Sequence, residues 1–256
     1  EIFLSNSFSK LIASSILLLP STALPHGIMP YMLRRQNIAA AEQMNMTKQK
    51  NKQKGIIAPE GISEVLLHAC CAPCSSAIVE WLLQHGIRPT IYYYNPNIYP
   101  LEEYEIRKTE SKRHAENLGL RWIDDDYRHD EWLEAVKGME GEPERGSRCL
   151  RCFTLRLTAT AAKAKSLGIR YFTTTLASSR WKSLTQITEA GMMAQSNVPE
   201  TEFWAQNWRK DGLQERRNQL LREYAFYNQL YCGCEFSMPE KRTDEEACQE
   251  CAVNDK

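Results

Sequence analysis

The sequence has no hydrophobic run long enough to cross a membrane and no excess of either charge. The apolar run from Leu11 to Leu19 is shorter than the roughly 20 residues that a membrane-spanning helix needs, so we expect no membrane partner. Lys and Arg number 32, as do Asp and Glu, which excludes a uniformly basic nucleic-acid coat protein. The sequence has 43% hydrophobic and 25% charged residues, and this composition also excludes a disordered chain and a coiled coil. What remains is a globular protein of one large domain or two small ones.

Both ends of the chain lack the pattern of a folded domain. Residues 1–59 join the short apolar run to a lysine-rich polar tract and imitate a secretory signal only loosely, so we predict a disordered or artefactual extension. Residues 239–256 form an acidic tail without apolar periodicity, which we also predict to be disordered. We assign no role to Cys248 and Cys251 in this tail. The folded domain is therefore expected over residues 60–238.

Between these ends, strand and helix patterns alternate. Short apolar or β-branched runs predict strands over residues 64–69, 90–94, 120–123 and 171–175. Helical spacing predicts helices over residues 76–84, 101–118, 131–138 and 153–167. We therefore expect an α/β fold with a mainly parallel sheet, helices on both faces, and a helical, aromatic C-terminal part after Asn197. In such sheets, ligands bind at the carboxyl ends of the strands.

Seven of the nine cysteines fall into three groups outside the tail, and the first group is Cys70, Cys71 and Cys74. It lies where the first predicted strand ends and the next helix begins. A helix N-terminus carries unpaired amides and the positive end of a dipole, which lowers thiolate pKa values and suits an anionic cluster. The adjacent Cys70 and Cys71 do not easily form a relaxed disulfide, whereas their thiolates can ligate one metal centre. We interpret the group as metal ligands rather than as small buried hydrophobic residues.

The second group is the pair Cys149 and Cys152, at the start of the helix predicted over residues 153–167. A single Cys-x-x-Cys is ambiguous, because it occurs in redox dithiols, zinc sites and iron-sulfur sites. Together with Cys70 and Cys71, the pair supplies four thiolates from two helix N-termini, as an iron-sulfur cluster requires. Structural zinc stays an alternative, although zinc ligands more often come from two Cys-x-x-Cys knuckles.

The third group is Cys232 and Cys234, which are separated by one glycine. Gly233 gives the backbone the freedom to bring the two sulfurs within bonding distance. A disulfide across so short a ring is strained, and strained disulfides are readily reduced. We interpret the pair as a switchable electron store, with two unrelated loop thiols as the alternative.

Positive charge is concentrated in one part of the chain. From Arg145 to Lys182 there are nine Lys and Arg residues and no Asp or Glu. Because this block surrounds the second cysteine pair, it predicts a surface beside the pair that holds phosphates, as RNA binding requires. A solvated helix face is the alternative. The aromatic residues around Trp208 are candidates either for stacking on nucleotides or for the core.

Several separated motifs together resemble the QueH family of epoxyqueuosine reductases. The segments HACCAPCSS, YNPNIYPLEEYEIR, SRCLRCFTLRLTATAAKAKSLG, YFTTTL and YNQLYCGCEFS occur in the family's order between about residues 64 and 238. The chain departs from the family over residues 177–182, where ASSRWK replaces the usual Ser-Pro pair with further polar residues. The resemblance implies a Rossmann-like domain of the nucleotide alpha-hydrolase type.

The resemblance also implies cofactors and residue roles. Four thiolates would hold a 4Fe-4S cluster, namely those of Cys70, Cys71, Cys149 and Cys152. Cys232 and Cys234 would form a redox-active disulfide, and Cys74 is a candidate ligand for an additional mononuclear iron.

The reaction implied is the last step of queuosine synthesis on tRNA. It removes the epoxide oxygen of epoxyqueuosine with two electrons and two protons, leaving an alkene and water. The partners would be a tRNA that carries epoxyqueuosine in its anticodon and an unidentified electron donor, in the reducing cytoplasm. His68 and Tyr231 are candidate proton donors, with a structural role as the alternative for each.

Two other functions share some of these features. An ATP-dependent tRNA-thiolating enzyme has a similar α/β layout, but its Ser-Gly-Gly-x-Asp-Ser phosphate loop is replaced here by CCAPCSS. This loop has no glycine that would let backbone amides approach a phosphate. A zinc-stapled RNA-binding module, in which all the thiols are structural, is the non-catalytic alternative. Iron or zinc content separates the module from the reductase, and ATP dependence identifies the thiolating enzyme.

Overall fold

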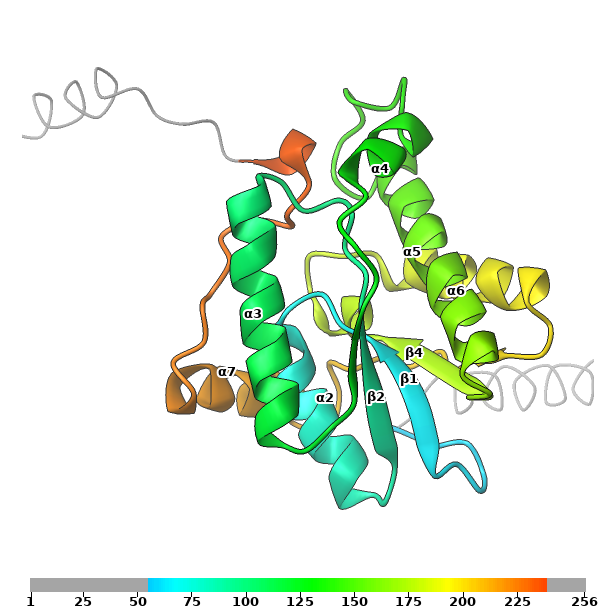
Figure 1. The fold of residues 1–256 in the computed structure, drawn as a ribbon, viewed down its shortest axis with the longest axis vertical. Coiled ribbons are helices and arrows are strands. Elements are labelled where there is room, and N and C mark those ends of the chain that lie inside the picture. Colours follow the sequence, from blue (N-terminus) through cyan, green and yellow to red (C-terminus); the bar gives the residue numbers. More distant parts are fainter. Residues whose placement is uncertain (1–54, 239–256) are drawn as a thin grey trace, which may run out of the picture. The chain divides into compact units, whose positions relative to one another are not determined.

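The computed structural model describes residues 55–238, which form a five-stranded parallel sheet flanked by helices (Figure 1). Every neighbouring pair of strands is parallel, and their spatial order is β3-β2-β1-β4-β5. The strands are β1 (Glu64–His68), β2 (Arg88–Tyr93), β3 (Trp122–Asp124), β4 (Tyr171–Thr174) and β5 (Glu202–Phe203). This is the order of a doubly wound, Rossmann-like sheet, which confirms the predicted α/β fold.

Helices cover both faces of the sheet, as predicted. One layer consists of α2 (Ala72–Gln84), α3 (Leu101–Asn117) and α7 (Leu213–Glu223), and α2 packs against the other two. The other layer contains α5 (Ser147–Ser166) and α6 (Leu184–Asn197), which pack against each other, and α4 (His129–Ala135) contacts α5. Two short 3-10 helices complete the fold, η1 (Thr175–Ser178) and η2 (Glu235–Ser237).

Two helices begin earlier than the periodicity predicts. Helix α2 begins at Ala72 rather than at residue 76, because Pro73 has a helical φ and needs no intrahelical partner for its nitrogen in the first turn. Helix α5 begins at Ser147 rather than at residue 153. Cys74 and the pair Cys149 and Cys152 are therefore helical residues, and the helices determine the directions of their side chains.

The C-terminal part is less helical than predicted. The sequence pattern did not indicate α6. After this helix the chain forms the short β5 and the helix α7, and residues 224–238 contain η2 as their only regular element. Trp204 and Trp208 are 6% and 1% exposed and pack against Trp81. The structure therefore supports a role in the core for these two residues and not a role in nucleotide stacking.

The chain reverses its direction of winding beside β1, and this reversal positions the site. Strands β2 and β3 lie on one side of β1, whereas β4 and β5 lie on the other. The loops that follow β1 and β4 therefore diverge and leave a crevice at the carboxyl ends of the strands. Cys70 follows β1 and Thr175 follows β4, and the amide of Cys70 donates a hydrogen bond to Thr175 Oγ1 over 3.1 Å.

The predicted ends of the domain lie mostly outside the described residues. This applies to residues 1–54 and 239–256, including Cys248 and Cys251. Residues 55–59, which we assigned to the extension, contact the domain: the amide of Ile56 donates to Asp211 over 2.6 Å, and the indole of Trp204 donates to the carbonyl of Ile57 over 3.0 Å. The boundary at residue 60 stays a prediction. Between residues 55 and 238, no helix has the length and apolar character that a membrane span requires.

Candidate functional site

A cavity of about 680 Å³ lies at the carboxyl ends of the strands, and all three cysteine groups meet there. Six thiol-bearing residues line it, namely Cys70, Cys74, Cys149, Cys152, Cys232 and Cys234. The seventh, Cys71, has its Sγ 3.8 Å from Cys70 Sγ. The fold thus brings three segments that are far apart in the sequence to one cavity.

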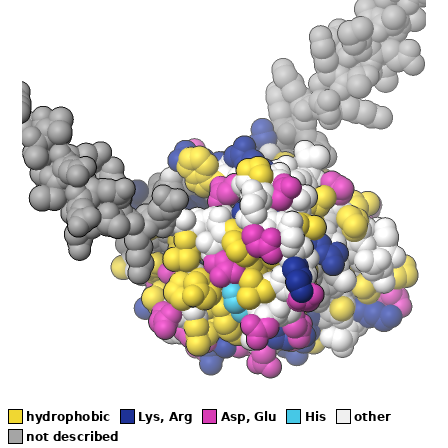
Figure 2. Space-filling model, turned by 90° about the horizontal axis from the view of Figure 1, so that it is seen from above, with side chains coloured by type: hydrophobic (Ala, Val, Ile, Leu, Met, Phe, Trp, Pro, Cys, Tyr) yellow, Lys and Arg dark blue, Asp and Glu magenta, His cyan; other side chains and the backbone are white. Residues whose placement is uncertain are grey.

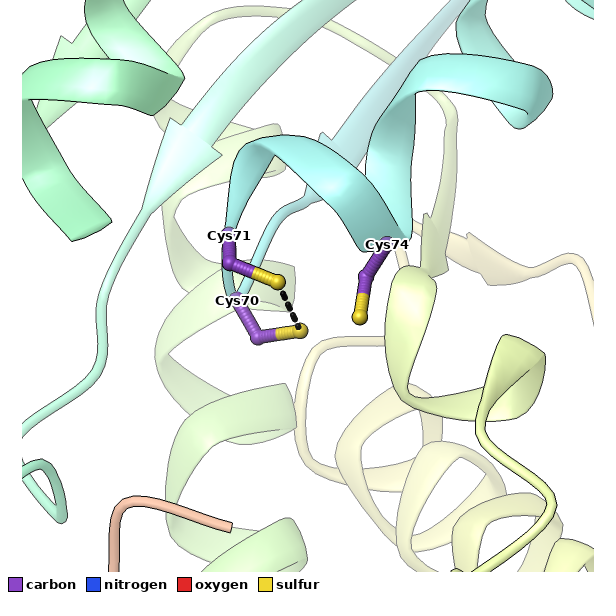
Figure 3. A group of neighbouring side chains, drawn as sticks. All are labelled: Cys70, Cys71 and Cys74. Carbon is purple, nitrogen blue, oxygen red and sulfur yellow. Dashed lines mark hydrogen bonds between the residues drawn. The ribbon is translucent and has the colours of Figure 1, made fainter. Parts of the chain in front are cut away.

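Cys70, Cys71 and Cys74 form a compact group of thiols (Figure 3). Their Sγ atoms all lie within 4.8 Å of one another. Cys71 is the N-terminal cap of α2 with an extended backbone (φ −172°, ψ 164°), and Cys74 lies in the first turn of the helix. Among the described residues, this is the group of three cysteine, histidine or acidic side chains whose ligand atoms are close enough to hold one metal ion. The group can bind a metal.

The three thiols of this group do not ionise alike. Hydrogen bonds from Cys71 and Cys74 lower the pKa of Cys70 well below its ordinary value, and the nearby Lys182 also lowers it. Burial raises the pKa of Cys71 well above its ordinary value, and the hydrogen bond with Cys70 raises the pKa of Cys74 to about 11. Cys70 is therefore the first of the three to ionise, and a metal would have to displace the protons of the other two.

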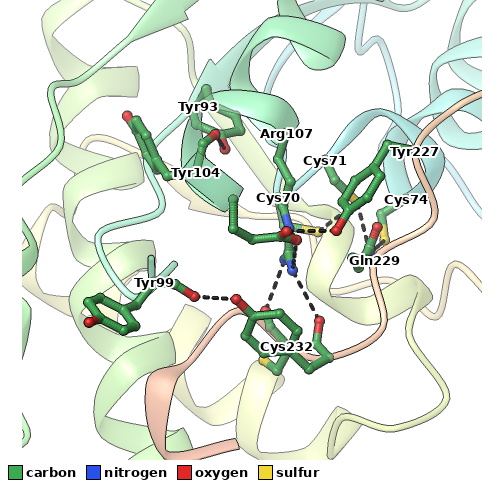
Figure 4. Close-up of polar contacts among 12 residues, drawn as sticks. Cys70, Cys71, Cys74, Tyr93, Tyr99, Tyr104, Arg107, Tyr227, Gln229 and Cys232 are labelled. Atoms are coloured by element: carbon green, nitrogen blue, oxygen red, sulfur yellow. Dashed lines mark hydrogen bonds and ion pairs between the residues drawn. The ribbon is translucent and has the colours of Figure 1, made fainter. Parts of the chain in front are cut away.

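Two neutral side chains donate hydrogen bonds to the sulfurs of this group. The hydroxyl of Thr175, directly after β4, donates to Cys70 Sγ over 3.3 Å. The side-chain amide of Gln229, from the segment after α7, donates to Cys71 Sγ over 3.2 Å and lies 3.6 Å from Cys74 Sγ (Figure 4). Both contacts place hydrogen-bond donors on sulfur, which favours thiolates.

Cys149 and Cys152 lie on the first turns of α5 and line another part of the cavity wall. Residues three apart on a helix lie on the same face, so both sulfurs reach the cavity. The amide of Arg145 donates to Cys149 Sγ over 3.3 Å, and Cys152 is buried beside Trp132 and Cys234. Burial raises the pKa of both thiols. Neither belongs to the compact group. Three of the four residues predicted as cluster ligands line the cavity, the fourth, Cys71, lies beside Cys70, and the four sulfurs do not share the short spacing of that group.

Cys232 and Cys234 are free thiols in the segment that follows α7. The Gly233 between them has φ +102°, and a Cβ at this position would lie 2.9 Å from Ile98 Cγ1 and 3.0 Å from Arg107 Nη1. Only glycine combines this conformation with so close an approach. The carbonyl of Gly233 accepts a hydrogen bond from the amide of Tyr99 over 2.8 Å. Glycine is thus required at position 233 because the segment packs closely against α3 and the loop before it. The same glycine separates the two cysteines.

Arg107, on α3, connects the Cys-Gly-Cys segment to the rest of the wall (Figure 4). Its Nη1 and Nη2 donate to the carbonyls of Cys232 and Tyr231, each over 3.2 Å. Its Nε donates to Glu103 over 2.7 Å, and the other oxygen of Glu103 accepts from the hydroxyl of Tyr227 over 2.7 Å. Arg107 is 3% exposed, so a buried guanidinium anchors the segment.

The cavity wall is strongly cationic. Seven basic side chains line it, against the single carboxylate of Glu144, and they are Arg107, Arg145, Arg148, Arg156, Arg180, Lys182 and Arg217. Arg148 and Arg156 are each 2% exposed, so part of the basic block points inward instead of forming a solvated helix face. Burial acts to lower the pKa of Lys182, but the thiolates of Cys232, Cys70 and Cys74 outweigh it and raise that pKa. Such a wall favours anionic ligands.

Five polar atoms of cavity-lining residues are buried and have no hydrogen-bond partner among the described residues. They are Oδ1 of Asn97, Nε1 of Trp132, Nε of Arg148, Nε of Arg156 and Oε1 of Gln229. Buried polar groups are rarely left unpaired in proteins, so these atoms indicate a polar ligand. Seven thiols, cationic neighbours and unpaired N–H donors together fit an anionic metal-sulfur group.

The outer surface around the site carries mixed charge. Figure 2 views the molecule from the side on which α4 and the beginning of α3 lie in Figure 1, and hydrophobic, acidic and basic side chains are interspersed on it. The excess of positive charge belongs to the cavity wall and not to this face as a whole.

His68, one of the two candidate proton donors, has a structural role. It is fully buried, its Nε2 donates to the carbonyl of Tyr94 over 3.1 Å, and its Nδ1 lies 2.8 Å from Thr174 Oγ1. Because Thr174 Oγ1 accepts from the amide of Leu176, its own proton is directed to Nδ1. Burial lowers the pKa of His68 to about 3, and the residue does not line the cavity. Tyr231 does line the cavity, and its hydroxyl donates to the carbonyl of Tyr99.

Sequence patterns did not identify Arg107, Thr175 or Gln229. Arg107 follows Glu103 by four residues on a polar helix, which is the pattern of an exposed ion pair. Gln229 lies in a segment without periodicity. Thr175 could have been found, because it ends a predicted strand of the sheet, where ligands bind.

Comparisons with known proteins agree with these observations. The family model of the epoxyqueuosine reductase QueH matches residues 65–240. The epoxyqueuosine reductase QueH of Acinetobacter baylyi is 45% identical over 180 residues, which cover 70% of this chain and 83% of the relative. That of Haemophilus influenzae is 46% identical, with 70% and 74% covered, and that of Thermotoga maritima is 35% identical, with 70% and 92% covered.

A solved chain described as a predicted subunit of a tRNA methyltransferase from Methanocaldococcus jannaschii also aligns. It covers 70% of this chain and 94% of its own length, at 13% identity and a TM-score of 0.42, a similarity too low to support any inference. The family match spans the whole thiol-lined site, from the strand before Cys70 to the residues beyond Cys234. The chain belongs to the QueH family of epoxyqueuosine reductases.

Proposed function

We propose that this chain reduces epoxyqueuosine in the anticodon of tRNA to queuosine, and that the thiol-lined cavity is its active site. One observation carries the proposal: six thiol-bearing residues from three segments line one cationic cavity at the carboxyl ends of the strands, and a seventh, Cys71, lies beside Cys70. Family membership names the reaction, and the cavity supplies the chemistry that the reaction needs. The thiolating enzyme and the zinc module have no comparable support.

The residues present fit an iron-sulfur centre. Cys70, Cys71, Cys149 and Cys152 would hold a 4Fe-4S cluster, and Cys74 would contribute to a further iron. When bound, these groups would supply single electrons and a Lewis acid for the epoxide oxygen. The buried guanidinium groups of the wall would offset the negative charge of four thiolates.

The Cys232 and Cys234 pair matches the electron count of the reaction. Removing the epoxide oxygen as water breaks two C–O bonds, forms a C=C bond, and consumes two electrons and two protons. The reduced pair releases two electrons and two protons when its S–S bond forms. A separate electron donor then has to reduce the disulfide again before the next turnover.

The chain's own side chains would prepare the site for this reaction. Arg107 holds the main chain of Cys232, so this sulfur is kept at the cavity wall. Thr175 and Gln229 donate hydrogen bonds to the sulfurs of the first group. The cationic wall attracts the phosphates of tRNA and stabilises the negative charge that develops on the epoxide oxygen. A reducing cytoplasm is the compartment that suits free thiols of this kind.

The first test is the metal content of anaerobically purified protein. We expect about four or more irons per chain with sulfide, and a broad absorption band near roughly 400 nm, as iron-sulfur proteins show. The double variant Cys149→Ser, Cys152→Ser should lose both. The matched control is Cys248→Ser, Cys251→Ser, which removes the other Cys-x-x-Cys and should keep them. Stoichiometric zinc without iron after anaerobic reconstitution would instead favour the structural module.

The second test is turnover on tRNA that contains epoxyqueuosine. The wild type should form queuosine with an added reductant and without ATP. Cys232→Ser should abolish turnover and keep the absorption band, because the residue is assigned to the redox pair and not to the cluster. Full multiple turnover by this variant would exclude the dithiol from the electron path.

A further inference from the structure

Trp181 is the largest apolar side chain exposed at the rim of the cavity. Its indole is 63% exposed, and the residue lines the cavity. It lies in residues 177–182, the stretch over which this chain departs from the family pattern. No part of the reduction described above uses it.

The backbone that carries Trp181 is tied down. Arg145 donates from Nε to the carbonyl of Trp181 over 2.8 Å and from Nη2 to the carbonyl of Arg180 over 3.2 Å. The next carbonyl, that of Lys182, accepts from Arg209 over 2.9 Å, and Gln186 in turn donates to the carbonyl of Arg145 over 2.8 Å. Three consecutive carbonyls are thus held by arginines. The indole is exposed on an anchored backbone, as a binding platform requires.

One cation lies against the indole, and others line the same cavity. The guanidinium of Arg180 lies 4.7 Å from the centre of the Trp181 ring, which is a cation–π distance. Arg217, from α7, lines the same cavity. An exposed aromatic ring in a cationic cavity is the combination that binds an unstacked nucleotide, because the ring stacks on the base and the cations attract the phosphates. A protein partner would require a wider apolar surface than this single ring provides.

We propose that Trp181 is the stacking platform for an anticodon-loop nucleotide next to the modified base, with Arg180 and Arg217 beside the flanking phosphates. The inference rests on the proposed function, because it takes the substrate to be tRNA. It adds a residue that orients the RNA so that the modified base enters the thiol-lined cavity. Trp181 is a positioning residue and does not act on the epoxide.

The test measures the dissociation constant of an anticodon stem-loop RNA at fixed salt. Trp181→Ala should weaken binding about 10-fold, the scale of losing one stacked base, while Trp181→Phe stays within about 3-fold of the wild type. The matched control is Met192→Ala, which removes an apolar side chain that is 47% exposed and lies outside the cavity, and it should leave the affinity unchanged. Equal circular dichroism spectra and unfolding midpoints show that each variant is folded.

The salt dependence separates stacking from charge. Trp181→Ala should keep the slope of log Kd against log salt, whereas Arg217→Ala should reduce it by about one, the value for one phosphate contact. An unchanged affinity in Trp181→Ala overturns the platform, even if the wild type reduces tRNA-bound epoxyqueuosine. If the wild type forms no queuosine but the affinity still depends on Trp181, the proposed reduction fails and the platform stands.

Discussion

The guanidinium of Arg107 donates a hydrogen bond to the main-chain carbonyl of Cys232 over 3.2 Å, and so ties α3 to the Cys-Gly-Cys segment. The same guanidinium pairs with Glu103, which is also buried. Arg107→Ala should therefore reduce the free energy of unfolding by about 3–5 kcal/mol, because it leaves a buried carboxylate without its partner. Arg107→Lys keeps the positive charge beside Glu103, so it should retain most of the stability. It loses the fork that reaches two carbonyls.

The lysine variant separates positioning from stability. We expect Cys232 in Arg107→Lys to react faster with iodoacetamide and turnover to fall about 10-fold or more, since small misplacements of reacting groups are costly. Mass spectrometry of the alkylated peptide measures the first effect. Arg113→Ala, on the same helix but with a side chain that is 56% exposed, is the control. Wild-type alkylation and turnover in Arg107→Lys would show that the two carbonyl contacts are dispensable.

Cys74 belongs by geometry to the group of Cys70 and Cys71, whereas we assign it to a metal other than the cluster. Cys74→Ser should therefore keep the iron-sulfur absorption and lose one iron, so that the ratio of iron to sulfide falls from roughly 5:4 to roughly 4:4. Serine is a poor ligand for iron in comparison with a thiolate. Elemental analysis with a sulfide assay gives the ratio. Joint loss of sulfide and colour would make Cys74 a cluster ligand instead.

Gly191, on α6, allows the helix to approach β5. A Cβ at this position would lie 2.2 Å from Phe203 Cε1, and Phe203 is itself buried against Phe172. Gly191→Ala should destabilise the protein by about 1–3 kcal/mol despite the better helix propensity of alanine, because the core has to shift. Urea unfolding measures the change. Gly141→Ala, which meets no atom within 4 Å, should be nearly neutral, and equal effects of both substitutions would contradict the packing argument.

The burial of His114, on α3, leads us to predict that the protein loses stability in mild acid. Its ring is 6% exposed between Tyr224 and Phe226, and neither ring nitrogen has a hydrogen-bond partner among the described residues. Burial, with a smaller contribution from Arg113, lowers the pKa of His114 below its ordinary value of 6.5. Below about pH 6.5 the unfolded chain binds this proton and the folded chain does not, so the free energy of unfolding falls as the pH falls.

The comparison with His114→Leu isolates this effect. Urea unfolding at pH 7.5 and at pH 5 gives the pH dependence of stability for each protein. The wild type should lose more stability between the two values than the variant, because leucine binds no proton. Equal losses in the two proteins would show that His114 titrates normally in the folded state.

Local patterns in the sequence were enough to predict much of the fold. Strand and helix periodicities identified β1 to β4 and the helices α2 to α5, since each pattern depends on residues close together in the chain. They also placed the first cysteine group at a strand end and the second at a helix start. The aromatic C-terminal part was less predictable, because Trp204 and Trp208 enter a core whose other members, such as Trp81, are distant in sequence.

The sequence by itself determined the chemistry of this protein, and the tertiary structure decided how that chemistry is assembled. The spacings of Cys70 to Cys74, of Cys149 and Cys152, and of Cys232 and Cys234 are constraints on a few neighbouring residues, so they can be interpreted without a fold. Three other features depend on contacts between distant segments. The three groups share one cavity, the buried Arg107 contacts Cys232, and Trp181 is exposed at the rim. Only the winding of the sheet about β1 brings those segments together, because it directs the ends of β1 and β4 to the same edge.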